Sequence, residues 1–353
     1  MSDSFRLVSE TTHIENSEEA IYSLFIERGW SDGLPIIPPT EQRVLRMLSL
    51  FGNKDPQEVV AILPPRLGAA TLEKIAINAV MAGCLPEYLP VIIAALKAMS
   101  EETFGLRGVQ STTHPCSPLI VVNGPIAPKI GLNGKGNAFG PGIRANATIG
   151  RAIRLIQINV GGAIPGQIDR STQGQPGKYT YCVAENEEDS PWQPFHVERG
   201  YKNEDSTVTV FAAEAPPNIN EHNSITGKGL LMSIAATMAT PGNNNALFFT
   251  GEPVLMLCPE HAATIAKDGF SKADVREFLF RNARFSTKRL SEENLQYRRK
   301  SPEKYGEFVD CDFVPIAHRD DFVVMVLGGP GKQSCFIPTF GNCSITKLIE
   351  FGV

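Results

Sequence analysis

Residues Val109–Pro125 read VQSTTHPCSPLIVVNGP, and the fold class follows from the apolar run inside this stretch. Its centre, Leu119–Val122, is short, rich in β-branched residues and bounded by proline and by Asn-Gly, which is typical of a buried strand. Two later runs end in a similar way, PVLMLCPE at 253–260 and FVVMVLGGPG at 322–331. These endings suggest a diverged internal duplication, although α/β proteins commonly share this arrangement.

The surrounding segments predict an α/β fold with a mixed, partly parallel sheet, flanking helices and an N-terminal helical cap. Residues 1–105 form a helical N-terminal region, and residues 106–353 form an α/β region of the catalytic type. Because little in the chain resembles a linker, we expect one interlocked unit. The predicted helices lie at 16–28, 40–51, 71–82, 86–100, 145–159, 224–240 and 260–268, and further strands at 206–213, 253–257 and 322–327.

Composition and charge argue against several classes of protein. The 353 residues carry a formal net charge of −5 and scattered basic side chains, so we expect no nucleic-acid partner. No run of ~18 apolar residues occurs, and the N-terminus lacks the apolar part of a signal peptide. We therefore expect no membrane span and a cytoplasmic location. The seven cysteines are odd in number and contain no C-x-x-C spacing, which disfavours a disulfide framework or a zinc ribbon.

The common nucleotide and hydrolase motifs are absent. Gly-Lys pairs occur at 134–135, 227–228 and 331–332, but no serine or threonine follows them, so none completes a phosphate-binding P-loop. The sequence contains neither H-E-x-x-H, the signature of zinc proteases, nor G-x-S-x-G, the signature of α/β-hydrolases.

A reactive thiol is predicted at the edge of the first strand. His114, Pro115 and Cys116 stand there in a row, and an imidazolium can lower the pKa of a thiol and make it nucleophilic. The simpler structural interpretation is a buried cysteine beside a hydrogen-bonded histidine. A second Cys/His pair, Cys258 and His261, follows a later predicted strand.

The segment 177–200, GKYTYCVAENEEDSPWQPFHVERG, is the densest polar stretch. Its first part alternates like a strand and places Cys182 on one face, which makes this thiol the other candidate nucleophile. Further along, His196 and Glu198 share a face if the segment is extended, so the carboxylate would orient the imidazole as a base.

An anion-binding loop is predicted at GPGIRANATIGRAIR, residues 140–154. Free N–H groups at a helix N-terminus bind anions, and an arginine there can pair with a carboxylate. Other polar side chains stand at the ends of predicted strands or at alternate positions of PPNINEHNS, residues 216–224. Extended backbone would place these alternate residues on one face. The predicted substrate-binding residues are Arg144, Asn146, Asn123, Glu185, Asn186, Asn218 and Asn220.

A transition-metal enzyme is the alternative prediction. Imidazole, carboxylate and thiolate groups bind Zn²⁺, Fe²⁺ or copper, and an open position on the metal would activate water or substrate. Its ligands would be His114, His196, Glu198 and His222. The thiol prediction requires no cofactor, whereas this alternative requires the metal.

Several stretches resemble a large, poorly characterised family whose members are often labelled thiol-disulfide oxidoreductases or are associated with the UGSC domain. That domain is named for a selenocysteine-Gly-Ser-Cys motif. The resemblance implies thiol or selenol redox chemistry, and since no C-G-S-C occurs here, it implies a UGSC-domain protein as a separate partner. It covers about residues 20–285. The matching stretches include DGLPIIPPT (32–40), EKIAINAVMAGCLPEYLPV (73–91), TTHPCSPLIVVNGP (112–125), GIRANATIGRAIRLI (142–156), PGKYTYCVAENEEDSPWQPFHVERG (176–200) and CPEHAATIAKDGFSKADVREFLF (258–280).

The sequence therefore predicts an enzyme that acts on a small anionic substrate through thiol-centred redox or lyase chemistry at Cys116 or Cys182. We also expect a homo-oligomer. Two alternatives stay open, namely the transition-metal enzyme and a non-catalytic partner subunit of a selenocysteine or cysteine oxidoreductase.

Overall fold

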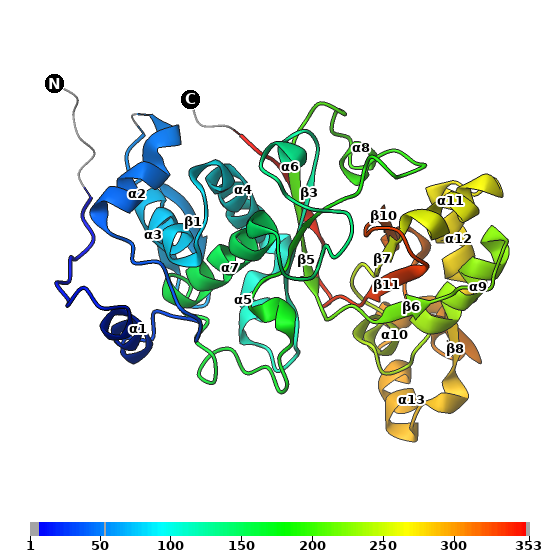
Figure 1. The fold of residues 1–353 in the computed structure, drawn as a ribbon. Helices are drawn as coiled ribbons and strands as arrows, with labels where there is room; N and C mark the ends of the chain where they lie inside the picture. Colours follow the sequence, from blue (N-terminus) through cyan, green and yellow to red (C-terminus); the bar gives the residue numbers. More distant parts are fainter. Residues whose placement is uncertain (1–6, 53, 351–353) are drawn as a thin grey trace.

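A computed structural model describes residues 7–52 and 54–350 and confirms the α/β fold. Two mixed four-stranded sheets lie in the middle of the molecule with helices on their outer sides (Figure 1). The first sheet has the strand order β12-β5-β3-β4 and the second β10-β7-β11-β6. Each contains one parallel pair, β3 with β4 and β7 with β10, and the remaining pairs are antiparallel.

The first sheet is built around β3, which is buried along its whole length. Leu119 and Val121 face the second sheet and join an apolar cluster to which both sheets contribute. Ile120 and Val122 face the helices on the other side. The strands of this sheet are β3 Ser117–Asn123, β4 Cys182–Ala184, β5 Thr207–Ala213 and β12 Ile345–Leu348.

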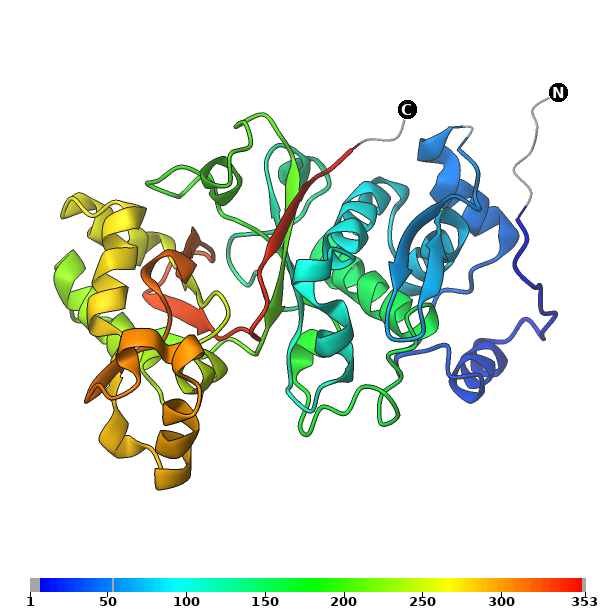
Figure 2. The same cartoon turned by 180° about the vertical axis from the view of Figure 1, so that it is seen from behind.

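The second sheet repeats the topology of the first. Its strands are β6 Asn218–Asn220, β7 Val254–Leu257, β10 Val323–Val326 and β11 Gln333–Ile337. The edge strands are exchanged between the halves: β6 directly follows β5 but joins the second sheet, and β12 follows β11 but joins the first. Figure 2 shows β12, in red, running back beside β5. This matched arrangement agrees with the predicted duplication, with β3 equivalent to β7 and β4 to β10.

The N-terminal helices form where they are predicted, as α1 Glu18–Glu27, α2 Glu41–Leu48, α3 Leu72–Ala82 and α4 Leu89–Met99. The sequence pattern misses the hairpin between α2 and α3, made of β1 Val59–Leu63 and β2 Gly68–Thr71. Both strands are short, and β1 is half exposed, so neither shows a long apolar run.

Packing divides the chain at a different place from the predicted boundary at residue 105. The N-terminal helices share one hydrophobic core with the first sheet and with α7, Arg144–Asn159. A second core joins the second sheet to α9 Gly227–Met238, α11 Pro259–Lys267 and α12 Lys272–Asn282. The chain therefore passes from the first lobe to the second between β5 and β6, and it returns to the first lobe with β12. The other elements are α5 Leu106–Ser111, α6 Ile126–Lys129, α8 Phe195–Glu198, α10 Asn244–Phe248, α13 Glu292–Arg299, α14 Pro302–Tyr305, β8 Arg284–Ser286 and β9 Phe313–Pro315.

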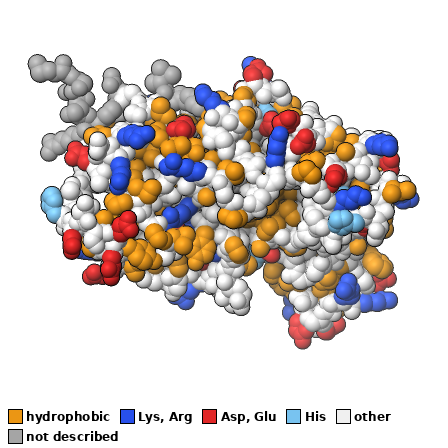
Figure 3. Space-filling view, viewed as in Figure 1, with side chains coloured by type: hydrophobic (Ala, Val, Ile, Leu, Met, Phe, Trp, Pro, Cys, Tyr) orange, Lys and Arg blue, Asp and Glu red, His pale blue; other side chains and the backbone are white. Residues whose placement is uncertain are grey.

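Lys and Arg side chains are interspersed with Asp and Glu over the face seen in Figure 3, rather than gathered in one patch. Among residues 7–52 and 54–350, no helix has both the length and the apolar character needed to cross a membrane.

A capping box stands at the start of α12. The Ser271 hydroxyl accepts from the Asp274 N–H at 3.2 Å, and the Asp274 carboxylate accepts from the Ser271 N–H at 2.9 Å. We expect Ser271→Ala to lower the free energy of unfolding by about 1 kcal/mol, since it leaves the Asp274 N–H of the first turn unpaired. Urea denaturation measures this. Ser301→Ala is the control, because Ser301 precedes α14 without a capping hydrogen bond; equal losses in both variants would contradict the prediction.

Candidate functional site

Two glycine-rich loops, 133–142 and 328–332, meet where the parallel strands end. A Cβ added to Gly329 would lie 2.7 Å from the Cα of Gly136, so the two backbones approach too closely for any side chain. Asn186 also joins the lobes. Its side-chain amide donates to the Gly328 carbonyl at 3.0 Å, and its backbone N–H donates to the Val326 carbonyl at 2.9 Å. Asn186, a predicted substrate ligand, is therefore engaged in joining the lobes.

A cluster of buried polar side chains lies at the carboxyl ends of β3 and β4. The Asn123 amide donates to Glu185 Oε2 at 2.6 Å and to Glu187 Oε1 at 2.8 Å. The Gly124 N–H also donates to Glu187 Oε1, at 2.7 Å. The structure thus brings together Asn123 and Glu185, two of the predicted substrate-binding residues. Sites in sheets with parallel strands are commonly found at this end of the strands.

His196 and Glu198 do not share the extended face that the sequence pattern suggests. They lie on the short helix α8, which begins where the Phe195 N–H donates to Glu185 Oε2 at 2.8 Å. The His196 ring is completely buried, with Nδ1 3.9 Å from Glu187 Oε1. Glu198 points elsewhere, so it does not orient His196 as predicted.

The second lobe contributes Lys272 to this cluster. Its ammonium donates to Glu198 Oε2 at 3.1 Å and lies 3.8 Å from Glu185 Oε1, while Arg276 binds the other oxygen of Glu198 at 3.0 Å. Burial raises the pKa of Glu185, and the nearby Lys272 charge opposes that shift. No local pattern predicts this contact, because Lys272 comes from the other half of the chain.

His114 and Cys116 lie at the opposite, amino-terminal end of β3. His114 Nε2 is paired with Glu214 Oε1 at 2.8 Å, and its ring packs against Phe340. The Cys116 thiol is buried, with Sγ 3.9 Å from the Val109 carbonyl oxygen. Burial raises its pKa to about 12, so the neutral thiol dominates at neutral pH.

Burial has the same effect on other cysteines. It raises the pKa of Cys84 and of Cys335 to about 12 and also raises that of Cys182, which lies on the helix-facing side of β4. As the alternation predicts, Tyr181 and Val183 face the cluster between the sheets and Cys182 faces the helices, but the strand comprises only Cys182–Ala184, and the Cys182 thiol lies in an apolar core. Neither predicted nucleophile has the surroundings that activate a thiol.

Cys258 is the cysteine whose surroundings favour the thiolate. It directly follows β7 and occupies the N-cap position of α11, and His261 lies in the first turn of that helix. Burial alone would raise the pKa of Cys258, but the imidazole and backbone N–H of His261 lower it by more, with a further contribution from the Ser334 hydroxyl. Burial would lower the pKa of His261, but Cys258 and the Glu221 carbonyl raise it. Both pKa shifts are in the direction that favours a thiolate beside an imidazolium.

Hydrogen bonds hold the His261 ring at both nitrogens. Nδ1 lies 2.8 Å from Ser334 Oγ, and Nε2 lies 2.8 Å from the Glu221 carbonyl oxygen. The Ser334 hydroxyl also accepts from the Cys258 N–H at 3.0 Å. The Glu221 backbone is fixed in turn, because its carboxylate accepts from the Ser233 hydroxyl at 2.6 Å. The imidazole is thus positioned from β11 and from the segment after β6.

The predicted anion loop uses its polar groups to hold itself together. Asn146 accepts from the Asn133 N–H at 2.8 Å, and its amide donates to the Asn133 carbonyl at 2.8 Å and the Ala138 carbonyl at 3.2 Å. Arg144 Nε donates to the Gly83 carbonyl at 2.9 Å. Asn146 therefore has no free hydrogen-bonding group for a substrate.

The face predicted along PPNINEHNS is confirmed. Asn218, Asn220 and His222 all bind the Gln333 side chain of the neighbouring strand, at 2.6, 2.8 and 2.9 Å. This row is exposed at the surface, so it does not converge on the cluster around Glu185.

The residues of the alternative metal site are not brought together. Within the described ranges, no group of three or more His, Cys, Asp or Glu side chains is arranged to hold a metal ion. The structure does not bring the four predicted ligands together: His196 and Glu198 lie on α8, whereas His114 is paired with Glu214 and His222 with Gln333.

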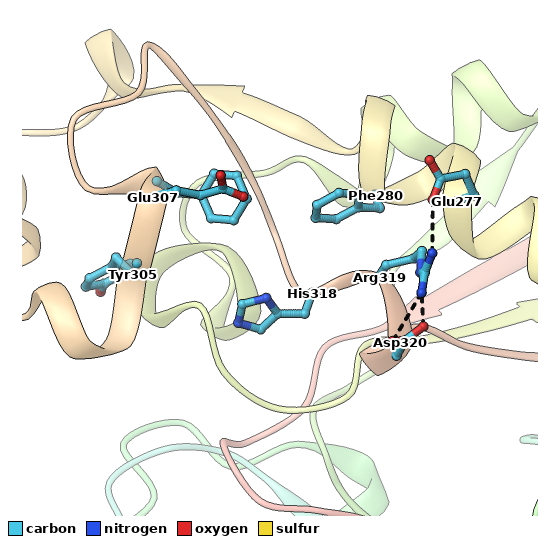
Figure 4. Close-up of a pocket in the computed structure, with 9 residues that line it drawn as sticks. Glu277, Phe280, Tyr305, Glu307, His318, Arg319 and Asp320 are labelled. Atoms are coloured by element: carbon cyan, nitrogen blue, oxygen red, sulfur yellow. Dashed lines mark hydrogen bonds and ion pairs between the residues drawn. The ribbon is translucent and has the colours of Figure 1, made fainter.

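A surface pocket of about 360 Å³ lies apart from these residues, between α12 and the segment after α14 (Figure 4). Arg319 is paired with Glu277 and Asp320 on one side of it, and Phe280 and His318 line the rest. The Arg319 charge is therefore already engaged by two carboxylates that line the same pocket.

In the sequence, Cys258 and His261 appear only as a Cys-x-x-His spacing after a predicted strand. Nothing in that spacing indicates that the pKa of the thiol is lowered. Their partners Ser334 and Glu221 are distant in sequence and carry no motif.

The chain matches no protein-family model, no curated protein and no solved structure.

Proposed function

We propose that this chain is a thiol-dependent enzyme in which Cys258 is the nucleophile and His261 its proton-transfer partner. The observation that carries the proposal is the Cys258–His261 pair at the N-terminus of α11, held by Ser334 and the Glu221 carbonyl. A helix N-terminus and an adjacent imidazolium are the two features that most commonly activate a cysteine.

Thiol–disulfide exchange is the reaction that we assign to the site, in line with the family resemblance of the sequence. The Cys258 thiolate attacks one sulfur of a small disulfide, so that a new S–S bond forms as the old one breaks. The leaving thiolate then takes the proton of the His261 imidazolium. Atoms and electrons balance, because Cys258 becomes a mixed disulfide while the substrate's other sulfur is reduced to a thiol.

The arrangement supports a single-thiol reaction. Cys335 is the cysteine nearest in the sheet, since it stands next to Ser334 on β11. It packs against the cluster between the sheets, whereas Ser334 on the opposite face binds Cys258. A second, external thiol would therefore release the mixed disulfide.

Only a small substrate fits this proposal, since the Cys258 side chain is almost fully buried. Loop 328–332 lies against the first turn of α11, where the Gly331 N–H donates to Glu260 Oε2 at 2.6 Å. We expect access to the thiol to require displacement of this contact.

Alkylation of the folded protein tests the proposal. At pH 6.5, iodoacetamide is expected to modify Cys258 at least tenfold faster than Cys116 or Cys182, because the thiolate is the reacting species. Mass spectrometry of the digested protein locates the label, and the exposed Cys343 gives the reference rate. Cys258→Ser should remove the fast phase, and Cys116→Ser should keep it. An unmodified Cys258 in protein labelled at Cys116 or Cys182 would overturn the proposal.

A further inference from the structure

The cluster at the carboxyl ends of β3 and β4 contains buried polar atoms that form no hydrogen bond with any described residue. Ten buried side-chain nitrogen and oxygen atoms lack a hydrogen-bond partner within the described part of the chain, and five of them belong to this cluster. Folded proteins keep such atoms rare, because each costs the free energy of its lost hydration. The five atoms are Asn123 Oδ1, Glu185 Oε1, Thr207 Oγ1 and both ring nitrogens of His196.

These atoms belong to one location. Thr207 is directly opposite Asn123 in the β3–β5 pair, so their side chains lie on the same face of the sheet. Glu185 is hydrogen-bonded to Asn123 and extends β4 beyond its last paired residue. His196 follows Phe195, whose N–H binds Glu185. Each of the four side chains is more than nine-tenths buried.

The unsatisfied atoms are mostly hydrogen-bond acceptors. The amide oxygen, the carboxylate oxygen and the hydroxyl oxygen each accept, and the His196 ring presents two further unsatisfied nitrogens. The site therefore offers at least three oxygen acceptors to the N–H donors of an ammonium ion.

The charges around the cluster also favour a cation. Three carboxylates, Glu185, Glu187 and Glu198, face only two cations, Lys272 and Arg276. Both of these cations bind Glu198, and Lys272 also lies 3.8 Å from Glu185 Oε1, so among the described residues Glu187 is the carboxylate of the three that forms no ion pair with a lysine or arginine. A buried charge needs a partner, and a protonated amine would supply both the charge and the donors.

We propose that this cluster is a binding site for a small protonated amine, with the ammonium ion as the smallest member of the class. Such a site would serve a reaction that releases or takes up an amino group. It is separate from the thiol chemistry proposed at Cys258, and either proposal can fail without the other.

Thermal unfolding of the full chain with ammonium chloride tests the site. We expect a saturable rise in Tm of about 3 °C or more, because a ligand that binds only the folded state stabilises it. Sodium chloride and tetramethylammonium chloride at equal concentration should not produce it, since neither cation donates hydrogen bonds. An equal response to sodium, or no response, would overturn the proposal and leave ordered water as the occupant. An equal response to potassium would also overturn it, in favour of an oxygen-coordinated metal cation.

Variants distinguish this site from general salt effects. Thr207→Val keeps the volume of the side chain but removes one acceptor, so the response to ammonium should weaken at least tenfold in apparent Kd. Glu185→Gln should abolish it. Glu188→Gln is the matched control, because that carboxylate lies on the same segment but is exposed. Cys258→Ser should leave the response unchanged. Retention of the full response in both Thr207→Val and Glu185→Gln would contradict the assignment.

Discussion

His261→Gln is expected to slow the alkylation of Cys258 at pH 6.5 by about 100-fold, because glutamine cannot carry the positive charge that stabilises the thiolate. Without that charge, burial dominates and raises the pKa of the thiol. The rate should then increase steadily as the pH rises through 9, whereas the unmodified protein should approach its plateau at a lower pH. Stopped-flow or quenched alkylation over this pH range measures both profiles.

His13→Gln is the matched control for this measurement, because His13 is exposed in the N-terminal segment, far from Cys258 in sequence. Its pH profile should equal that of the unmodified protein. If the profile of His261→Gln also stays unchanged, His261 does not activate the thiol and its hydrogen bonds serve only the packing of α11.

Lys272→Met is expected to lower the free energy of unfolding by about 3–5 kcal/mol, because it removes the positive partner of buried carboxylates. Its side chain is only 4 % exposed, and it contacts both Glu198 and Glu185. Methionine keeps most of the apolar stem, so the loss reports mainly on charge. Urea denaturation at neutral pH measures the change.

Two controls separate this effect from the general loss of a lysine. Lys135→Met removes a lysine whose ion pair with Glu188 is exposed, and it should cost less than about 1 kcal/mol. Adding Glu198→Gln to Lys272→Met should recover part of the stability. If the two lysine variants lose the same stability, Lys272 does not hold the lobes together through these carboxylates.

The same variant should respond to pH in a defined direction. Burial raises the pKa of Glu185, so the folded state binds this proton more tightly than the unfolded state does. The stability that depends on the protonated form is present at low pH and is lost as the pH rises through the folded-state pKa. Lys272→Met removes the positive charge that opposes this shift, so its loss of stability should be smaller at pH 5 than at pH 8.

Local patterns in the sequence predict much of the secondary structure, because they depend on residues that are close along the chain. The apolar run Leu119–Val122 lies in a buried strand, and the Ser271 capping box begins a helix. The alternation on either side of Cys182 correctly separates the two faces of β4. Such features require only the preferences of neighbouring residues and the period of the strand or helix.

Predictions that depend on the surroundings of a side chain were less complete. His196 and Glu198 seem adjacent in an extended segment, but the bond from Phe195 to Glu185 starts a helix there and turns them apart. The Cys/His pair at Cys116 and the pair at Cys258 look alike in sequence. They differ because burial without a partner raises the pKa of Cys116, whereas His261 overcomes burial at Cys258.

The amino-acid sequence by itself determined the α/β class, most helices and strands, and the similarity between the strand endings of the two halves. The folded chain determined which edge strand joins which sheet, which cysteine has a lowered pKa, and that Lys272 reaches the carboxylates of the other lobe. The physical reason is distance along the chain. Helix and strand preferences act over a few residues, whereas pairing, burial and charge depend on groups that meet only after folding.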